Sequence, residues 1–443
     1  MHPEAGKLEQ DAPRDTTPAV RNAGPEASDD HDTSRDTSMK SSGQISAILP
    51  SLAFWVWSAL LSYPMMAQKV NLAEPGDAPL IPVFSVAIWQ ATGLLLFLVA
   101  VVITRYHRLS STFQHLNPAQ VAILAVILMS LVLQLHGDEP ATLLGIGYTV
   151  LILVTALALA VLWTMTPADV ERCTRIASIV FCLFGIVAIT FLGWPQGRNV
   201  GSIQPNLFAT PLLAGFILSQ FSPGRLGVVV RILCIGMVAL VSSRFALLGC
   251  ICAFMVYELT YNPLSPWKIP VLIVAFAAGL FFWPQLASVF ALDDASRDLS
   301  SGFSGRDVYW QHTLSAIADR PLGIGFKRGL SDASGHNGYL KTLLEFGIAG
   351  GALIIVLVGC NIVLAGIEAV RSSRKTHQQR RFASARFAGL LSLSIGAFFQ
   401  PQLLSLGDAF AMSFMFLLFR PRTSPTSVRR VGSRTTLQPL RPV

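Results

Sequence analysis

The stretch "RLGVVVRILCIGMVALVSSRFALLGCICAFMVYELTY" (residues 225–261) decides the fold, because it holds two long apolar runs joined by a very short connection. A bilayer core needs about 20 mostly apolar residues per helix. Within lipid, backbone polar groups are satisfied only in helices and closed barrels, and uninterrupted runs of this length exclude a barrel. The two runs, 225–241 and 244–261, therefore predict a pair of transmembrane helices.

Similar runs recur along the whole chain of 443 residues, which is 52% hydrophobic and only 13% charged. We expect an all-α polytopic membrane protein with about twelve transmembrane helices. The predicted spans are 44–63, 80–104, 118–136, 141–165, 176–194, 205–221, 225–241, 244–261, 269–290, 339–368, 383–401 and 404–419.

Charge in the connections predicts the orientation. Arginine and lysine gather in alternate loops and in the C-terminal tail, which predicts that both termini lie in the cytoplasm. We expect a disordered, acidic N-terminal tail (1–43), a transmembrane domain (44–419) whose first span is an uncleaved anchor, and a basic C-terminal tail (420–443). One larger loop, 291–338, is expected on the extracytoplasmic side between spans nine and ten. The basic tail indicates topology and contact with anionic membrane lipid rather than nucleic acid.

Few ionisable residues lie near the spans, and each is a candidate for function. Arg244 falls in a connection so short that its guanidinium must sit at the outer membrane face, where an arginine can also simply reach the headgroups. Arg306 begins a short amphipathic helix that Pro321 ends. His336 follows Gly335 and directly precedes an apolar helix, whose N-terminus favours a bound anion.

The sequence contains no strong cofactor-binding motif. The chain has no phosphate-binding GxxxxGK[ST] loop and no HExxH zinc motif. Asp293 and Asp294 are adjacent acids without a third convergent ligand, which is weak evidence for a metal. Lys341 and Glu345, four residues apart, are expected to pair with each other. We therefore expect no metal and no other cofactor.

Several motifs together resemble the O-antigen ligase and polymerase family. They are "SGRDVYWQHTLSAIADRPLGIGFKRG" (304–329), "SGHNGYLKTLLEFGIAGG" (334–351), "QPNLFATPLLAG" (204–215) and "SSRFALLG" (242–249). The motifs occur in the order expected for that family, over the second half of the chain.

The resemblance implies a membrane glycosyltransferase of the GT-C class. Such enzymes transfer a glycan from undecaprenyl diphosphate, on the periplasmic side of the bacterial inner membrane, to lipid A core (ligases) or to another lipid-linked glycan (polymerases). The resemblance therefore implies that loop 291–338 is periplasmic. Arg244, Arg306 and His336 match the family's functional residues and are the expected catalytic residues. The expected substrate-binding residues are Asn337, Tyr339, Asn206 and Arg198. Two arginines suit a diphosphate leaving group, and an imidazole suits deprotonation of an acceptor hydroxyl.

Other functions remain open on sequence alone. A twelve-span secondary transporter would share the span count and topology, although transporters usually show two similar halves. A protein O-oligosaccharyltransferase of the same family is a further alternative. Ligase and polymerase are about equally supported, and the sequence indicates neither the sugar nor the acceptor.

Overall fold

A computed structural model describes most of the chain from residue 114 onward. The described ranges are 114–134, 139–164, 166–195, 199–201, 203–262, 306–326, 336–372, 376–405 and 408–421, with isolated positions between 52 and 112 and between 270 and 281. Outside these residues lie the predicted N-terminal tail, the C-terminal tail beyond Pro421, most of the first two spans and of the ninth span, and Arg198. Within them the chain is helical, apart from an isolated antiparallel bridge between Val200 and Ile203.

The predicted apolar runs correspond to helices. In chain order these are α3 (Pro118–Gln134), α4 (Glu139–Leu162), α5 (Pro167–Leu192), α6 (Pro205–Ser219), α7 (Arg225–Leu240), α8 (Arg244–Tyr261), α11 (Arg306–Asp319), α12 (Gly338–Arg371), α13 (His377–Gly396) and α14 (Ala409–Leu418). Four of them, α3, α6, α7 and α8, begin at the first residue of the predicted span.

Two helices begin about two turns before their predicted spans. In α5, Thr166 caps the helix by accepting a hydrogen bond from the Asp169 N–H, and Pro167 occupies the first turn. In α13, Thr376 accepts from the Gln379 N–H in the same way. The first turns of both helices are polar, so hydropathy alone predicts only their apolar continuation.

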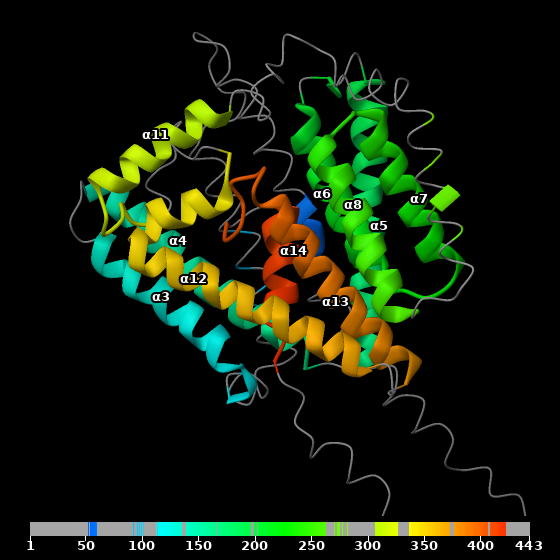
Figure 1. Cartoon of the computed structure of the whole chain (residues 1–443), viewed down its shortest axis with the longest axis horizontal. Helices are drawn as coiled ribbons and strands as arrows, with labels where there is room; N and C mark the ends of the chain where they lie inside the picture. Colours follow the sequence, from blue (N-terminus) through cyan, green and yellow to red (C-terminus); the bar gives the residue numbers. More distant parts are fainter. Residues whose placement is uncertain are drawn as a thin grey trace, which may run out of the picture. The chain divides into compact units, whose positions relative to one another are not determined.

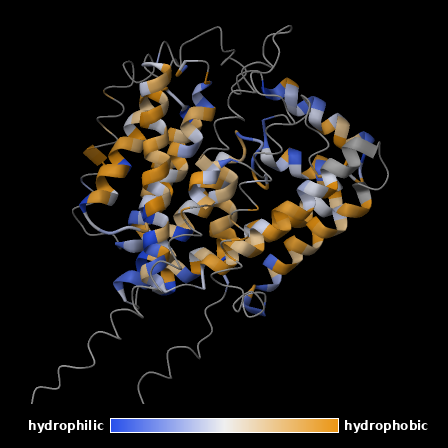
Figure 2. Ribbon diagram, turned by 180° about the vertical axis from the view of Figure 1, so that it is seen from behind, coloured by the Kyte–Doolittle hydropathy of each residue, from blue (hydrophilic) through white to orange (hydrophobic). Residues whose placement is uncertain are grey.

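Helix α6 lies at the centre of the packing. It contacts α5, α7, α8, α13 and α14, and nearly all of its residues are buried. Helix α13 packs most extensively on α8, while α12 packs on α3 and α13, and α11 runs along the beginning of α12 (Figure 1). Figure 2 shows apolar residues along the bodies of the helices and hydrophilic residues gathered toward their ends, as expected for helices that cross a membrane.

Four of the described helices contain segments long and apolar enough to cross a membrane, namely Gly145–Leu162, Pro167–Leu192, Arg244–Tyr261 and Gly338–Arg371. The segments Pro118–Val132, Pro205–Ser219 and Ala409–Leu418 are apolar but shorter. The protein is therefore a multi-pass helical membrane protein, and the count of twelve spans stays a prediction.

The short helix α14 is entirely buried, and distant side chains bond the carbonyl groups at its end. Trp163 Nε1 donates to Phe416 O at 2.6 Å, Arg386 Nε donates to Leu417 O at 2.9 Å, and Gln120 Nε2 donates to Leu418 O at 2.6 Å. Backbone groups inside a membrane protein need such partners. Its ten residues rise only about 15 Å, so α14 covers about half of a bilayer core.

Candidate functional site

The three predicted catalytic residues all lie at helix N-termini. Arg244 is the first residue of α8, Arg306 is the first residue of α11, and His336 stands two positions before α12. The N-terminus of a helix carries a partial positive charge and exposes N–H groups. Each of the three side chains therefore stands where the backbone itself favours an anion.

Backbone strain marks two of these three helix starts. Among the described residues, Ser242 (φ 51°) and His336 (φ 48°) are the non-glycine residues with positive φ, and each lies two positions before its helix. An L-residue seldom adopts this left-handed conformation, which costs of order 1–3 kcal/mol and tends to occur at functional sites. The strain thus falls at the starts of α8 and α12, beside the residues already singled out.

Arg306 and Arg244 lie within electrostatic range of each other. Burial, and then the positive charge of Arg244, lower the pKa of the Arg306 guanidinium from its usual value. The Arg306 guanidinium also lies over the ring of Phe399, with its carbon 5.7 Å from the ring centroid. Two guanidinium groups brought together in partly dehydrated surroundings repel each other, and an anion between them would relieve that repulsion.

His336 is exposed and meets the helix that carries Arg306. Its ring and that of Tyr309 are 6.1 Å apart and nearly perpendicular, at 88°. Tyr309 follows Arg306 by three residues, so both project from the same side of α11. Helix α11 thereby connects the arginine part of the site with the histidine part.

Asn337 and Tyr339 hold the start of α12 in place. Asn337 Oδ1 accepts hydrogen bonds from the N–H groups of Tyr339 (2.9 Å) and Leu340 (3.1 Å), so it is the N-cap of the helix. The Tyr339 hydroxyl donates to Ser394 O at 2.7 Å, and the Gly338 N–H donates to Ala397 O at 2.7 Å. These bonds fix the start of α12 against the end of α13.

Asn206 joins the remaining upstream motif to the site. The Ser243 hydroxyl donates to Asn206 Oδ1 at 3.0 Å, which ties the start of α6 to the residue before Arg244. The Ser243 side chain makes no capping hydrogen bond to α8. Arg198 lies outside the described residues. The binding roles expected for Asn206, Asn337, Tyr339 and Arg198 therefore stay predictions.

A backbone clasp holds α11 to α12. The turn after α11 donates from Ile324 N–H to Leu344 O and from Gly325 N–H to Glu345 O, both at 3.0 Å, and Pro321 O accepts from Ile348 N–H at 2.8 Å. At this place α12 is interrupted by Gly347 (φ 73°, ψ 170°). The interruption frees the backbone groups that the turn then bonds.

Close packing at the clasp requires glycine on both sides. A Cβ on Gly347 would meet the Leu322 carbonyl, and a Cβ on Gly323 would meet the Gly347 amide nitrogen. Both glycines also have positive φ, which they adopt without steric cost.

Sequence reasoning missed three aromatic residues of the site: Tyr309, Phe398 and Phe399. The ring of Phe398 lies 4.5 Å from that of Tyr339, and Phe399 lies under Arg306. Tyr309 stands inside the quoted "SGRDVYW" motif, so its spacing from Arg306 was an available signal. The two phenylalanines belong to the segment after α13, which is distant in sequence from every other part of the site.

The expected pair of Lys341 and Glu345 forms, with 3.9 Å between Lys341 Nζ and Glu345 Oε1. No group of three or more histidine, cysteine or acidic side chains able to hold a metal occurs in the part of the chain that the structure describes. Asp293 and Asp294 lie outside that part.

Comparison with known families identifies the segment that carries these residues. Residues 229–355 match the O-antigen ligase family, and this segment contains Arg244, Arg306 and His336. The resemblance predicted from the motifs is confirmed over this range.

Among solved structures, one chain from "Structural coordination of polymerization and crosslinking by a peptidoglycan synthase complex" is similar. It is 17% identical, with a TM-score of 0.40, and the match covers 69% of this chain and 96% of that one. No curated protein matches the chain.

Proposed function

From the premise that residues 229–355 carry an O-antigen ligase domain, we propose that the protein transfers a glycan from undecaprenyl diphosphate to a sugar hydroxyl. The acceptor is lipid A core, as for a ligase, or another lipid-linked glycan, as for a polymerase. The reaction takes place at the periplasmic face of the bacterial inner membrane. The observation that carries this proposal is the contact between the rings of His336 and Tyr309, because Tyr309 belongs to α11, the helix that Arg306 begins. The positive charge of Arg244 also lowers the pKa of Arg306.

The two arginines act on the donor. When the bond between sugar C1 and the diphosphate oxygen breaks, negative charge develops on the diphosphate. Guanidinium groups donate paired hydrogen bonds to phosphate oxygens and stay charged at every working pH. Partial burial of Arg306 strengthens this stabilisation relative to water.

His336 acts on the acceptor. A neutral imidazole at the exposed mouth of α12 accepts the proton of the acceptor hydroxyl as its oxygen attacks sugar C1. The electron pair of the C1–O bond leaves with undecaprenyl diphosphate, and attack from the opposite side inverts the anomeric centre. Asn337, Tyr339, Asn206 and Arg198 assist substrate binding, and the polyprenyl chain of the donor lies among the helices.

The test uses the full-length protein in lipid vesicles with an undecaprenyl-diphosphate-linked glycan and a hydroxyl acceptor. The expected result is release of undecaprenyl diphosphate together with a longer or newly attached glycan. A secondary transporter would leave the donor intact, so an unconsumed donor in the presence of a suitable acceptor contradicts the proposal.

Deletion in the source organism then separates the two acceptor classes. Loss of a ligase leaves lipid A core without glycan, and loss of a polymerase leaves core carrying a single repeat. A protein O-oligosaccharyltransferase would instead leave a secreted protein without its glycan.

A further inference from the structure

A group of arginines lies at the end of the molecule opposite the candidate site. Helix α8 runs for 18 residues from Arg244 at the site to Tyr261, a rise of about 27 Å, which is close to the thickness of a bilayer core. Helix α13 packs along α8 and begins beside this far end, whereas its last turn lies at the site. The far end carries Arg380 and Arg381 in the first turns of α13.

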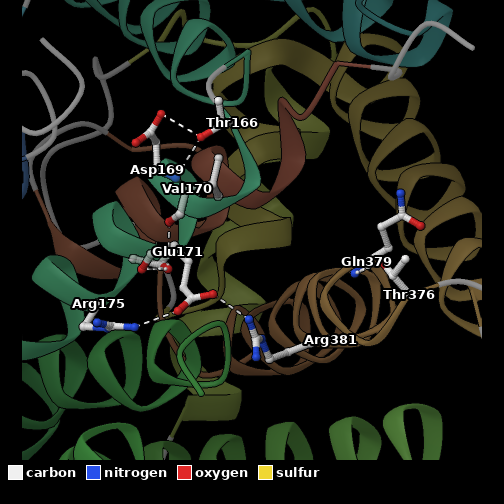
Figure 3. A network of polar contacts seen from close by, with 9 residues as sticks. Thr166, Asp169, Val170, Glu171, Arg175, Thr376, Gln379 and Arg381 are labelled. Carbon is white, nitrogen blue, oxygen red and sulfur yellow. Dashed lines mark hydrogen bonds and ion pairs between the residues drawn. The ribbon is translucent and has the colours of Figure 1, made fainter. Parts of the chain in front are cut away.

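The nearby acid Glu171 forms ion pairs with two arginines, Arg175 and Arg381. Its Oε1 accepts from Arg175 Nη2 and its Oε2 accepts from Arg381 Nη2, both at 2.6 Å (Figure 3). In Figure 3 the carboxylate stands between the two arginines, so each oxygen has its own guanidinium partner. Among the described residues, the ion-pair partners of Glu171 are thus Arg175 and Arg381 and not Arg380.

Arg380 has donors that nothing satisfies. Its Nε and Nη2 are shielded from water and have no hydrogen-bond partner in the described part of the chain. The guanidinium lies over the ring of Tyr261, with its carbon 5.7 Å from the centroid. Hydrogen-bond donors that are shielded from water and have no partner are costly. Nη1 is not among the shielded atoms and the side chain is only half-buried, so an anion can reach it.

Further unsatisfied polar atoms lie at the adjoining end of α6. Gln220 is 1% exposed, and neither its amide nitrogen nor its amide oxygen has a hydrogen-bond partner in the structure as described. The hydroxyl of Ser222 and Nε of Arg381 are also buried without a hydrogen-bond partner in the described part of the chain. The rings of Phe221 and Phe382 are 5.6 Å apart, which brings this end of α6 to the start of α13. Buried polar groups nearly always have partners, and a polar group bound at this end of the molecule would supply them.

We propose that this end of the molecule binds the phosphate of an anionic phospholipid headgroup, with Arg380 as the principal contact. Arg381, Gln220 and Ser222 complete the surroundings of the headgroup. Arginine binds phosphate through paired hydrogen bonds. A lipid is the source because the site lies about one bilayer thickness from the other membrane face, and because tyrosines such as Tyr261 are enriched where helices leave the membrane.

The experiment measures thermal unfolding of the full-length protein in nanodiscs of phosphatidylcholine, with and without added phosphatidylglycerol. A ligand that binds the folded state raises the unfolding midpoint, and we expect a rise of at least about 2 °C for the wild-type protein. Arg380→Gln is expected to lose this rise. In phosphatidylcholine alone it should unfold at or above the wild-type midpoint, because an uncompensated charge has been removed.

The matched control is Arg371→Gln, which removes an exposed arginine from the end of α12 and should keep the full rise. An unchanged response in Arg380→Gln would overturn the site, and so would a lower midpoint of that variant in phosphatidylcholine alone. If inorganic phosphate produced the same rise in phosphatidylcholine discs, the lipid source would be wrong. Should Arg380→Gln not be recovered folded, Arg380→Lys keeps the charge without the paired donors and is expected to lose most of the rise.

Discussion

At the scale of single residues, the surroundings of His336 and Arg306 differ in the way that their proposed roles require. His336 is exposed and held in a left-handed backbone conformation, whereas Arg306 is half-buried and stacked over Phe399. An acceptor arriving from water needs to reach the imidazole. A diphosphate that develops charge is better stabilised by a guanidinium withdrawn from water.

Replacing the imidazole tests the proton-accepting role. We expect His336→Ala to lower the rate of glycan transfer by about 10²- to 10⁴-fold, the usual contribution of a general base. His312→Ala is the matched control, because His312 is exposed on the neighbouring helix α11. Transfer is measured as undecaprenyl diphosphate released per unit of folded protein. Equal rates for His336→Ala and wild type would remove His336 from the mechanism.

A second substitution tests the geometry of the arginine. Arg306→Lys keeps one positive charge but loses the planar pair of donors, so we expect transfer to fall by about 10²-fold. Arg320→Lys, at an exposed position just beyond the same helix, should leave the rate unchanged. The measurement is the same assay at saturating donor. A lysine variant as active as wild type would mean that charge alone suffices.

Residues of the site could be predicted from the sequence where they belong to a motif. Residues that only the fold brings to the site could not be predicted. Arg244, Arg306 and His336 stand in recognisable motifs. Phe399 lies under Arg306 although 93 residues separate them, as the sequence numbering gives 399 − 306 = 93. Such a contact depends on how α11 and α13 each pack on α12, and hydropathy carries no signal for it.

At the scale of elements, the clasp between the turn after α11 and the interrupted turn of α12 determines where Arg306 stands. The clasp consists of three backbone hydrogen bonds and two glycines in close approach. Because α11 has only two buried residues of its own, Thr313 and Ile317, it depends on this attachment more than on a hydrophobic core.

A methyl group at the clasp should therefore displace α11. We expect Gly347→Ala to destabilise the protein by about 1–3 kcal/mol, because alanine is strained at positive φ and its Cβ would meet the Leu322 carbonyl. Glycan transfer should fall along with the stability. Gly359→Ala in the same helix is the control, since a Cβ there meets nothing within 4 Å.

Thermal unfolding and the transfer assay are measured on both variants. If Gly347→Ala matched Gly359→Ala in both, the clasp would have no part in holding Arg306.

Element starts were predictable where the apolar run and the helix coincide, as in α3, α6, α7 and α8. The segment "HQQRR" at the start of α13 is helical but polar, so it was assigned to a loop. The end of the chain was also predicted as one apolar span, 404–419, although helix α14 covers only Ala409–Leu418. The buried segment before α14 packs closely against Gly338 at Leu403, and a local pattern cannot indicate such a contact.

At the scale of the whole molecule, the proposed chemistry uses positive charge supplied by the chain itself. We expect glycan transfer to proceed without a metal ion, because Arg244 and Arg306 together provide the charge that stabilises a diphosphate leaving group. The rate should stay within about twofold on addition of EDTA. Loss of transfer in EDTA, with recovery on addition of Mg²⁺ or Mn²⁺, would contradict this expectation.

The length of helix α8 limits how the sequence of this protein can change over evolution. Its first residue is Arg244 and its last is Tyr261, over which Arg380 lies, so each end has a fixed neighbour. One inserted residue would lengthen the helix by about 1.5 Å and turn one end by about 100° relative to the other. Substitutions on its exposed side, at residues such as Ile251, leave the length of the helix and the relative orientation of its two ends unchanged. Relatives that keep both ends should therefore vary in the composition of α8 but keep its length.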